Sequence, residues 1–368
     1  MNKVNILHIV WRPDIGGLEG FVLSLSKEQK EKYNVTVCFL GKDSYLAEEF
    51  KRVGIDIKII GMFNGLDVFS AVRLILFLKA SRFDVIHVHC HNFLLNLCLK
   101  FAKKTPKIIT EHGGESLVGR LWKTKLIYKL FISNYKKIIA NSQYTKKALI
   151  DKIRINPDKI LVVHCGIDIK KFGILLNIQK KKYELGIKAN FKVVGIIGRL
   201  VKQKGIHFFI SMAKEVLQYE PEVDFLIIGD GPLKKSLLEM SEYLGVDKRI
   251  KFLGFRRDIP ELLYIIDVFA FTSEYEPLGI VLVEAMASGI PIVGFNVGGI
   301  PEVVVHNETG ILVSEKDHIL LAKTTIHLLR NEGLRKKMGQ NGQCRARLYF
   351  DIRAVARETE QIYKKYLH

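Results

Sequence analysis

Two glutamates, Glu276 and Glu284, stand eight residues apart on either side of an apolar stretch that contains a glycine. The glycine predicts a turn before a helix, so that Glu276 lies in the loop and Glu284 on the second helical turn. The first N–H groups of a helix have no partner within it and bind phosphate well. Here they would belong to Leu278, Gly279, Ile280 and Val281. Carboxylates accept hydrogen bonds from hydroxyls, so the layout fits a diphosphate between two hydroxyl-rich rings, as in a nucleotide-sugar. A glutamate at a helix start also complements the helix dipole, which is a purely structural use.

Two basic residues, Arg199 and Lys204, follow a predicted strand. The apolar run at residues 192–197 indicates the strand, and Gly198 ends it. Doubly wound sheets bind ligands at the carboxyl ends of their strands. There, arginine offers a phosphate a bidentate pair of donors and lysine offers a point charge. The alternative is that both side chains are simply solvated on a loop.

Adjacent glycines, Gly16 and Gly17, follow the first predicted strand and would let the backbone approach a ligand closely. The loop lacks the third glycine of a G-x-G-x-x-G fingerprint, and so does the sequence at residues 229–232. This argues against a dehydrogenase. The chain has no Walker A sequence either.

Three alternate histidines, His87, His89 and His91, suggest a metal site, because alternate residues of a strand share one face. The chain has no Asp-x-Asp sequence, however, and no carboxylate stands between these histidines in the sequence. We therefore expect no bound metal and no other cofactor.

With 368 residues, the chain is long enough for two domains, each with its own core. Its first apolar run is too short for a secretory signal, and no apolar run is long enough to span a bilayer. The five cysteines form no Cys-x-x-Cys pair, so neither a disulfide framework nor a zinc site is indicated. We expect a cytoplasmic protein.

The net charge of +19 is unevenly distributed, with 20 Lys and Arg against 5 Asp and Glu between Lys100 and Lys182. Nucleic acid and an anionic membrane surface are the two partners that such a block suggests. Within it, residues 118–140 interleave six basic residues with Trp122, Tyr128 and Phe131, which is typical of an interfacial helix. The alternative is an ordinary surface helix whose apolar face packs on the core.

Short apolar runs alternate with longer segments of helical periodicity, which predicts parallel sheets with helices on both faces. The first set of predicted strands comprises residues 5–10, 35–39, 55–60, 85–88, 108–110, 137–140 and 160–163. The second set comprises residues 192–197, 225–228, 250–253, 268–271, 292–294 and 310–313. We predict an α/β protein with two doubly wound, Rossmann-like domains, residues 1–167 and 168–345, and a C-terminal helix, residues 346–368.

The sequence from Phe252 to Val313 resembles the donor half of glycosyltransferase family 4. The motifs that carry the resemblance are Gly254-Phe255, Ser273 to Gly279, Glu284 to Pro291 and Gly298 to Glu302. The resemblance extends more weakly over nearly the whole chain. It implies the GT-B fold, in which two domains face each other across a cleft and the C-terminal helix crosses back to the N-terminal domain. The first domain would face the acceptor and the membrane, and the second would bind the donor.

The resemblance also implies roles for the candidate residues. Arg199 and Lys204 would hold the diphosphate, Glu284 the ribose, and Glu276 the sugar. His112, in the motif after another predicted strand, would hydrogen-bond the donor sugar near the reacting carbon. The catalytic residues would thus be His112, Glu276, Arg199 and Lys204. The remaining donor contacts would be Gly16, Gly17, Gly198, Phe255, Arg256, Leu278, Gly279, Ile280, Val281 and Glu284.

These expectations describe a retaining, metal-independent glycosyltransferase of the hexosyltransferase class. Its acceptor would be a saccharide, preferably lipid-linked, in bacterial cell-surface polysaccharide synthesis. It would lie peripherally on the inner, anionic face of the plasma membrane and bind no nucleic acid. Two alternatives stay open. One is a nucleotide-sugar 2-epimerase of the same fold, which needs no acceptor; the other is a non-enzymatic nucleotide- or nucleic-acid-binding protein.

Overall fold

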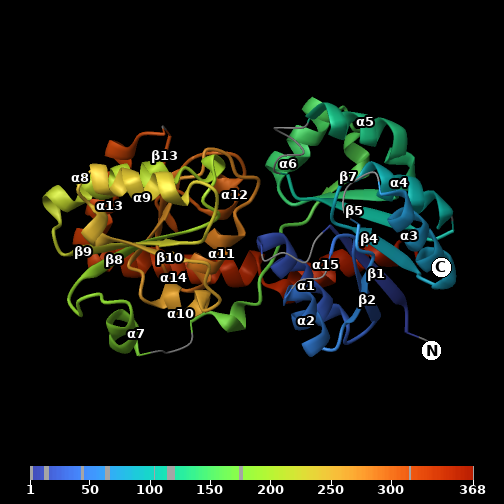
Figure 1. The fold of residues 1–368 in the computed structure, drawn as a ribbon, viewed down its shortest axis with the longest axis horizontal. Coiled ribbons are helices and arrows are strands. Elements are labelled where there is room, and N and C mark those ends of the chain that lie inside the picture. The colour runs from blue at the N-terminus through green and yellow to red at the C-terminus, as the bar shows by residue number, and fades with distance from the viewer. Residues whose placement is uncertain are drawn as a thin grey trace. The chain divides into compact units, whose positions relative to one another are not determined.

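The computed structural model describes residues 3–11, 16–42, 45–62, 67–102, 104–113, 121–173, 177–314 and 316–367. The chain forms two compact units (Figure 1). Unit 1 comprises Met1–Gly166 together with Ile352–His368, and unit 2 comprises Ile167–Asp351. Among the described residues, none of the helices has the length and apolar character needed to cross a bilayer.

Unit 1 is built on a parallel sheet of seven strands. They are β1 (Asn5–Val10), β2 (Asn34–Phe39), β3 (Asp56–Ile59), β4 (Val85–Val88), β5 (Lys107–Glu111), β6 (Lys137–Ala140) and β7 (Ile160–Val162). Their order in the sheet is β3-β2-β1-β4-β5-β6-β7. The chain therefore builds outward from β1 in one direction and then returns to add β4 on its other side. Such a switch point between β1 and β4 leaves a crevice at the carboxyl ends of the two strands.

Helices cover the sheet of unit 1. They are α1 (Gly17–Gln29), α2 (Tyr45–Arg52), α3 (Val68–Ala80), α4 (Phe93–Cys98), α5 (Leu121–Phe131), α6 (Gln143–Ala148) and α15 (Ile352–Lys364), with the short helices η1 (Leu99–Phe101), η3 (Ile132–Asn134), η4 (Leu149–Ile153) and η5 (Pro157–Lys159). The C-terminal helix α15 packs on α1. An ion pair of 3.2 Å between Lys32 and Glu360 adds to this contact.

Unit 2 is built on a parallel sheet of six strands. They are β8 (Lys192–Ile197), β9 (Val223–Ile228), β10 (Ile250–Gly254), β11 (Val268–Phe271), β12 (Ile292–Phe295) and β13 (Gly310–Val313). Their order is β10-β9-β8-β11-β12-β13, so the switch point lies between β8 and β11. The central strands are buried on both faces, which is why they appear in the sequence as continuous apolar runs.

The helices of unit 2 are α7 (Ile178–Glu184), α8 (Ile206–Tyr219), α9 (Lys234–Tyr243), α10 (Ile259–Tyr264), α11 (Ile280–Ala287), α12 (Ile300–Val303), α13 (His318–Arg330) and α14 (Glu332–Tyr349), with η6 (Ile169–Lys171), η7 (Lys202–Lys204) and η8 (Asp247–Arg249). Helices α8 and α13 pack against each other, as do α11 and α14. The turn after α11 also lies close to α14, because a Cβ atom on Gly339 would lie 2.0 Å from the carbonyl oxygen of Gly289.

The predicted architecture of two doubly wound α/β units is confirmed. Each predicted strand is present, with ends that differ by at most two residues. The division of the chain differs slightly from the expected one, since unit 2 begins at Ile167 and ends at Asp351. Residues 346–351 were assigned to the C-terminal helix, but α14 runs without a break to Tyr349, and its buried face includes Ala346 as well as Gly339 and Gly342. The C-terminal helix itself begins at Ile352.

The prediction of one basic helix over residues 118–140 was wrong. The helix α5 covers only Leu121–Phe131, and residues 114–120 lie outside the described part of the chain. The lysines at positions 136 and 137 stand at the start of strand β6. Two of the three aromatic residues, Tyr128 and Phe131, are 3% exposed and belong to the core, whereas Trp122 is 67% exposed. The alternative of a helix that packs one apolar face on the core is therefore correct for part of this segment.

Candidate active site

The switch point of unit 2 brings the two predicted charge clusters together. Arg199 and Lys204 follow strand β8, and Glu276 follows the neighbouring strand β11. The two loops touch at Gly205, which has a φ of +59° and where a Cβ atom would lie 2.1 Å from the carbonyl oxygen of Thr272. The hydroxyl of Thr272 donates to the carbonyl of Lys204 over 3.1 Å. Only glycine fits this junction, so the sequence Lys-Gly fixes where the lysine stands.

Lys204 and Glu276 form a direct ion pair, with 2.5 Å between Nζ and Oε2. Their side chains are 20% and 11% exposed, so the pair is partly withdrawn from water. The side chain of Gln203 donates to the carbonyl of Tyr275 over 3.0 Å and ties the two loops together beside the pair. Two residues that the sequence assigned to different parts of a ligand are thus in contact. A positive and a negative group stand side by side at the edge of the sheet, both within reach of solvent.

Arg199 is exposed at the end of β8. No carboxylate of the described residues lies within ion-pair distance of it, so its guanidinium is available for an anion. Gly198 lies directly before it and is in close contact with Gly229, where a Cβ atom would meet the Gly198 carbonyl oxygen at 2.0 Å. Gly229 and Gly231, which follow β9, were noted only for the fingerprint that they fail to complete. Their structural part is to let the loops after β8 and β9 pack tightly.

The start of helix α11 lies in the loop after Glu276. Gly279 has a φ of +83° and forms the N-cap, with no side chain to accept from the first amide groups of the helix. Those N–H groups therefore remain available to a ligand. A further glycine, Gly298, supports the loop, since a Cβ atom there would meet the carbonyl oxygen of Glu276 at 2.0 Å. Sequence analysis did not assign Gly298 to the site, although it belongs to a motif that carried the family resemblance.

Glu284 lies on the second turn of α11, as predicted from the spacing. Burial raises the pKa of its carboxyl group to about 7, and the nearby Lys171 lowers it by a smaller amount. A carboxyl with this pKa is present in both protonation states near neutral pH. It can therefore accept a hydrogen bond from a hydroxyl and, when protonated, also donate one.

Phe255 and Arg256 follow strand β10. The ring of Phe255 is 49% exposed. The guanidinium of Arg256 is bound to both carboxylate oxygens of Asp258, at 2.7 and 2.5 Å. Lys181 binds the same carboxylate at 2.6 Å, and the hydrogen bonds from Arg256 hold the pKa of Asp258 well below its usual range. The side chain of Arg256 is thus engaged in an ion-pair network within unit 2.

The switch point of unit 1 holds the remaining predicted residues. Gly16 is the N-cap of α1, in an extended conformation with a φ of −157°, and Gly17 is the first helical residue. The residues before them, 12–15, lie outside the described part of the chain. His112 follows β5 and is partly exposed. Its loop is held by Glu111, whose carboxylate accepts from the Gly113 N–H over 3.0 Å; sequence analysis did not identify this role of Glu111.

The three alternate histidines do not form one cluster. His91 lies beyond the end of β4 and binds Glu111, with 2.5 Å between Nε2 and Oε2. His87 and His89 instead meet His8 of strand β1, and these three are the only such group among the described residues with ligand atoms close enough to hold a metal. Both ring nitrogens of His87 are already hydrogen-bonded, to Tyr363 at 2.5 Å and to Thr110 at 2.6 Å.

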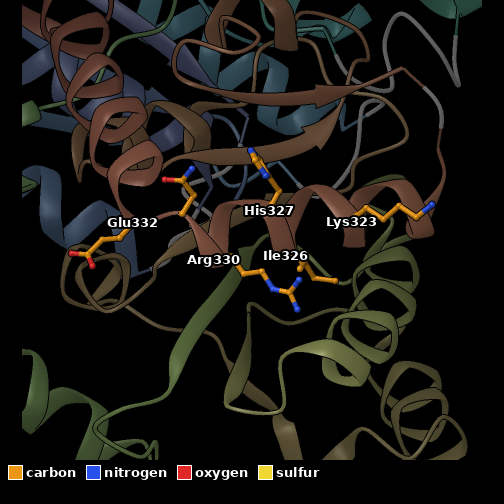
Figure 2. A pocket seen from close by; sticks show the side chains of 6 residues that line it. Lys323, Ile326, His327, Arg330 and Glu332 are labelled. Atoms are coloured by element: carbon orange, nitrogen blue, oxygen red, sulfur yellow. The ribbon is translucent and has the colours of Figure 1, made fainter.

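A shallow depression of about 480 Å³ lies elsewhere on unit 2, at the end of α13 (Figure 2). Two of its charged residues have partners: Arg330 binds Glu220 at 2.6 Å and Glu332 binds Lys336 at 2.6 Å. A lysine at the start of β8, Lys192, donates to the carbonyl of Leu329 there over 2.7 Å. The depression therefore lies at the amino edge of the sheet, opposite the charged pair, and we assign it no role.

Comparison with known proteins identifies the family of the chain. The family model for glycosyl transferases group 1 matches residues 177–345, and the model for glycosyltransferase family 4 matches residues 15–171. A relative described as an uncharacterized glycosyltransferase of Methanocaldococcus jannaschii is 30% identical over 301 residues, which cover 78% of this chain and 76% of the relative. The UDP-Gal:alpha-D-GlcNAc-diphosphoundecaprenol alpha-1,3-galactosyltransferase of Escherichia coli is 29% identical over 261 residues, or 68% of this chain and 67% of that protein.

Among solved structures, HepE of Anabaena in complex with UDP and glucose superimposes with a TM-score of 0.87. The match covers 98% of this chain and 100% of HepE at 24% sequence identity, which establishes a common fold. This fold is GT-B, as expected from the motifs at residues 252–313. The chain belongs to the group 1 glycosyltransferases of family 4 and is a glycosyltransferase.

Proposed function

We propose that this glycosyltransferase binds a nucleotide-sugar at the β8–β11 switch point and transfers its sugar with retention of the anomeric configuration. The observation that carries the proposal is the contact of Lys204 with Glu276 next to the uncapped start of α11. A cation, a carboxylate and free amide groups in one loop cluster are what a diphosphate joined to a sugar requires.

The Lys204–Glu276 pair suggests how the donor enters. Without a ligand, each residue satisfies the charge of the other at 2.5 Å. A bound diphosphate would offer Lys204 a stronger partner, and Glu276 would then accept hydrogen bonds from hydroxyls of the sugar. Arg199 would bind the diphosphate as a second cation, and Glu284 would accept from the ribose hydroxyls.

Catalysis in this proposal is mainly positioning and charge stabilisation. The bond between the anomeric carbon and the leaving phosphate oxygen breaks while the acceptor oxygen attacks from the same face. The acceptor's proton passes to the leaving phosphate. Arg199 and Lys204 stabilise the negative charge that develops on the diphosphate, and for this reason we propose that turnover needs no divalent metal.

We propose a lipid-linked saccharide as the acceptor. The Escherichia coli relative is named for a diphosphoundecaprenol-linked acceptor, and a relative of Staphylococcus aureus is named for capsular polysaccharide biosynthesis. Such an acceptor lies in a membrane, so the enzyme needs a surface that can rest on one.

Helices α3, α4 with η1, and α5 of unit 1 provide a surface of this kind, which we call the basic apolar surface. The helices are neighbours, because α4 contacts both α3 and α5 (Figure 1). Their exposed apolar side chains are Val68, Phe69, Val72, Leu76, Phe93, Leu97, Phe101, Trp122, Leu126 and Leu130. Among them Phe69 is 85% exposed and Trp122 is 67% exposed. An exposed apolar patch of this extent marks a site of interaction.

The positive charge of the basic apolar surface indicates which kind of partner it binds. The four helices carry six basic residues and no acidic one; these are Arg73, Lys79, Lys100, Lys123, Lys125 and Lys129. Lysines lie over exposed or neighbouring rings, as Lys79 does over Phe101 at 5.4 Å. Asp67, which caps α3, is a carboxylate at the end of this surface, and it accepts hydrogen bonds from Ser70. Apolar side chains among lysines, on helices that contain no acidic residue, match an anionic lipid surface. We propose that the enzyme attaches to the membrane through this surface.

The experiment that tests the proposal is incubation of the purified chain with UDP-, GDP- and ADP-sugars in the presence of a chelator, with and without a lipid-linked acceptor. We expect one donor to stabilise the protein thermally and to yield a product with the donor's anomeric configuration by NMR. An epimerised sugar formed from donor alone would support the 2-epimerase alternative. A failure of all nucleotide-sugars to bind would refute the assignment of the site.

A further inference from the structure

The two faces of helix α5 have different surroundings. Its outer face carries Trp122, Leu126 and Leu130, which are 67%, 45% and 47% exposed and belong to the basic apolar surface. Its inner face packs on unit 1, and Tyr128 on that face is 3% exposed. The hydroxyl of Tyr128 donates over 3.3 Å to Oε2 of Glu111, the last residue of strand β5. Only the width of this helix therefore separates the proposed membrane contact from a buried carboxylate.

The carboxylate of Glu111 joins three parts of unit 1. Its Oε2 lies 2.5 Å from Nε2 of His91, which follows strand β4. Its Oε1 accepts from the N–H of Gly113, in the loop after β5, over 3.0 Å. The third part is α5, which contributes Tyr128, and the ring of Tyr128 packs edge-on against that of His91 with 4.9 Å between their centroids. The position of the loop after β5 is thus connected to the position of α5 through one side chain that is 2% exposed.

The hydroxyl of Tyr128 remains a donor over the whole physiological pH range. Burial raises the pKa of Tyr128 well above its usual value, and the charge of Glu111 raises it further. A buried carboxylate that loses a hydrogen-bond donor keeps the cost of its desolvation without the compensating contact. Removal of the Tyr128 hydroxyl therefore favours a rearrangement that brings Glu111 closer to water, and Gly113 would move with it.

Helix α5 is weakly secured to the rest of unit 1. It has 11 residues, of which Thr124, Tyr128 and Phe131 are buried. Isolated helices shorter than about 12–15 residues are only marginally stable in water, so α5 depends on these few contacts. An element with few buried contacts opens locally more often than the strands of the core. A membrane that covers the outer face binds the formed helix and not the open segment, so it shifts this local equilibrium toward the helix.

We propose that attachment to an anionic membrane orders the loop after β5, and that Tyr128 is the positioning residue that transmits this effect. The inference rests on the membrane attachment that is part of the proposed function. The formed helix holds the hydroxyl of Tyr128 on Glu111, and Glu111 in turn holds the N–H of Gly113. All of these contacts lie within unit 1. Because the same loop carries His112, a candidate catalytic residue, the enzyme is fully ordered only at the surface where a lipid-linked acceptor lies.

The response is expected at Gly113 and not in the strand before it. The backbone carbonyl of Glu111 accepts from the N–H of Asn141 over 3.2 Å, and the side chain of Asn141 donates to the carbonyl of His112 over 3.0 Å. Asn141 follows strand β6 and has no part in α5. The loop is therefore held at two points, of which only the Gly113 contact depends on the helix. The amides of strand β5 serve as an internal reference.

Hydrogen exchange of the full chain, measured by mass spectrometry with and without phosphatidylglycerol vesicles, tests this inference. We expect the vesicles to slow the exchange of the α5 amides and of the Gly113 amide about tenfold, which corresponds to about 1.4 kcal/mol. The exchange of β5 should not change. If the vesicles bind and slow α5 but not Gly113, the inference is refuted. If the wild type does not bind the vesicles at all, the proposed membrane attachment is refuted instead.

Two tyrosine variants test whether Tyr128 transmits the effect. Tyr128→Phe keeps the ring and removes the hydroxyl, so vesicles should still bind and slow the exchange of α5 but no longer that of Gly113. The matched control is Tyr135→Phe, which removes an equally buried hydroxyl that donates to Asn96 over 2.7 Å. It should respond to vesicles as the wild type does. A slowed Gly113 amide in Tyr128→Phe, or an unaffected one in Tyr135→Phe, would overturn the assignment to Tyr128.

A variant of the outer face tests the same coupling without altering the buried contacts. Lys123→Glu/Lys125→Glu/Lys129→Glu keeps the inner face of α5 and should no longer bind the vesicles. Without attachment, the exchange of α5 and of Gly113 should be the same with and without lipid. Slower exchange at Gly113 in this variant on addition of vesicles would show that the loop responds to something other than the attachment of α5, and the inference would fail. Circular dichroism and thermal unfolding establish that each variant folds.

Discussion

Replacing Lys204 by alanine should affect the donor site in two ways. The lysine is 20% exposed and lies 2.5 Å from Glu276, so its removal deletes a cation at the diphosphate and leaves a carboxylate without its partner. Loss of one electrostatic contact to a developing charge lowers kcat by about 10²- to 10³-fold, or ~2.7–4 kcal/mol. The unpaired Glu276 would in addition repel the donor, so we expect the upper end of this range for kcat/KM.

The matched control is Lys202→Ala, which removes an exposed lysine from the same short helix, η7, two residues away. It should leave transfer unchanged, because Lys202 does not contact Glu276. The double variant Lys204→Ala/Glu276→Gln should recover donor affinity relative to Lys204→Ala, because the repulsion is gone, while turnover stays low. Initial rates of transfer with the donor varied give kcat and KM separately. If Lys204→Ala transfers sugar as fast as Lys202→Ala, the lysine does not stabilise the leaving diphosphate.

Three further outcomes are expected. Chelator and metal stripping should leave the transfer rate unchanged; loss of activity that Mn²⁺ or Mg²⁺ restores would contradict the assignment of charge stabilisation to Arg199 and Lys204. The triple variant Lys123→Glu/Lys125→Glu/Lys129→Glu should no longer sediment with anionic vesicles at low salt, since each basic residue near such a surface contributes about 1 kcal/mol. The equally charged control Lys214→Glu/Lys248→Glu/Lys337→Glu, on unit 2, should still sediment, and equal loss in both would indicate a nonspecific effect of net charge. Burial raises the pKa of Glu284 from 4.5 in the reference state to about 7, so between these pH values the folded chain binds this proton and the unfolded chain does not. The free energy of unfolding should therefore fall as the pH rises from about 4.5 to 7. The free energy of unfolding of Glu284→Gln, measured in urea, should lack this part of the decrease. An identical pH dependence in the variant and the wild type would show that the pKa of Glu284 is not raised in the folded chain.

The strands were predictable because both sheets are parallel and buried. A strand such as β12, with its four residues fully enclosed, has no polar face and appears as an uninterrupted apolar run. Among the glycines that shape the site, Gly279 was predicted, whereas Gly205 and Gly298 were not. Gly205 and Gly279 have positive φ values of +59° and +83°, and few other residues adopt such angles. Short stretches of sequence therefore predict both a buried parallel strand and a glycine turn that follows it.

The contacts across the sheet were not predictable from the sequence. Lys204 and Glu276 are separated by 72 residues, and they meet only because β11 is added next to β8 after β9 and β10 have been placed on the other side. His8 was missed for the same reason. It stands alone in an apolar strand, and its partner His89 is 81 residues away at the end of β4. The expected grouping of His91 with His87 and His89 was wrong because β4 ends at Val88. His89, one residue beyond the strand, still lies beside His87, but the alternation does not extend to His91.

The basic apolar surface shows how much a fold adds to a helical pattern. On α5, the spacing of four residues that places Trp122, Leu126 and Leu130 outside also places Thr124 and Tyr128 inside. The composition of α5 does not indicate which of its two faces is buried and which is exposed. The exposed residues of α3 and α4 have no basic block around them in the sequence and therefore gave no signal of their own. Only the packing of α4 between α3 and α5 joins three modest apolar faces into one. A membrane would meet the joined surface, so Phe69→Ser, which changes no charge, should weaken vesicle binding although it lies more than 50 residues from the lysines of α5.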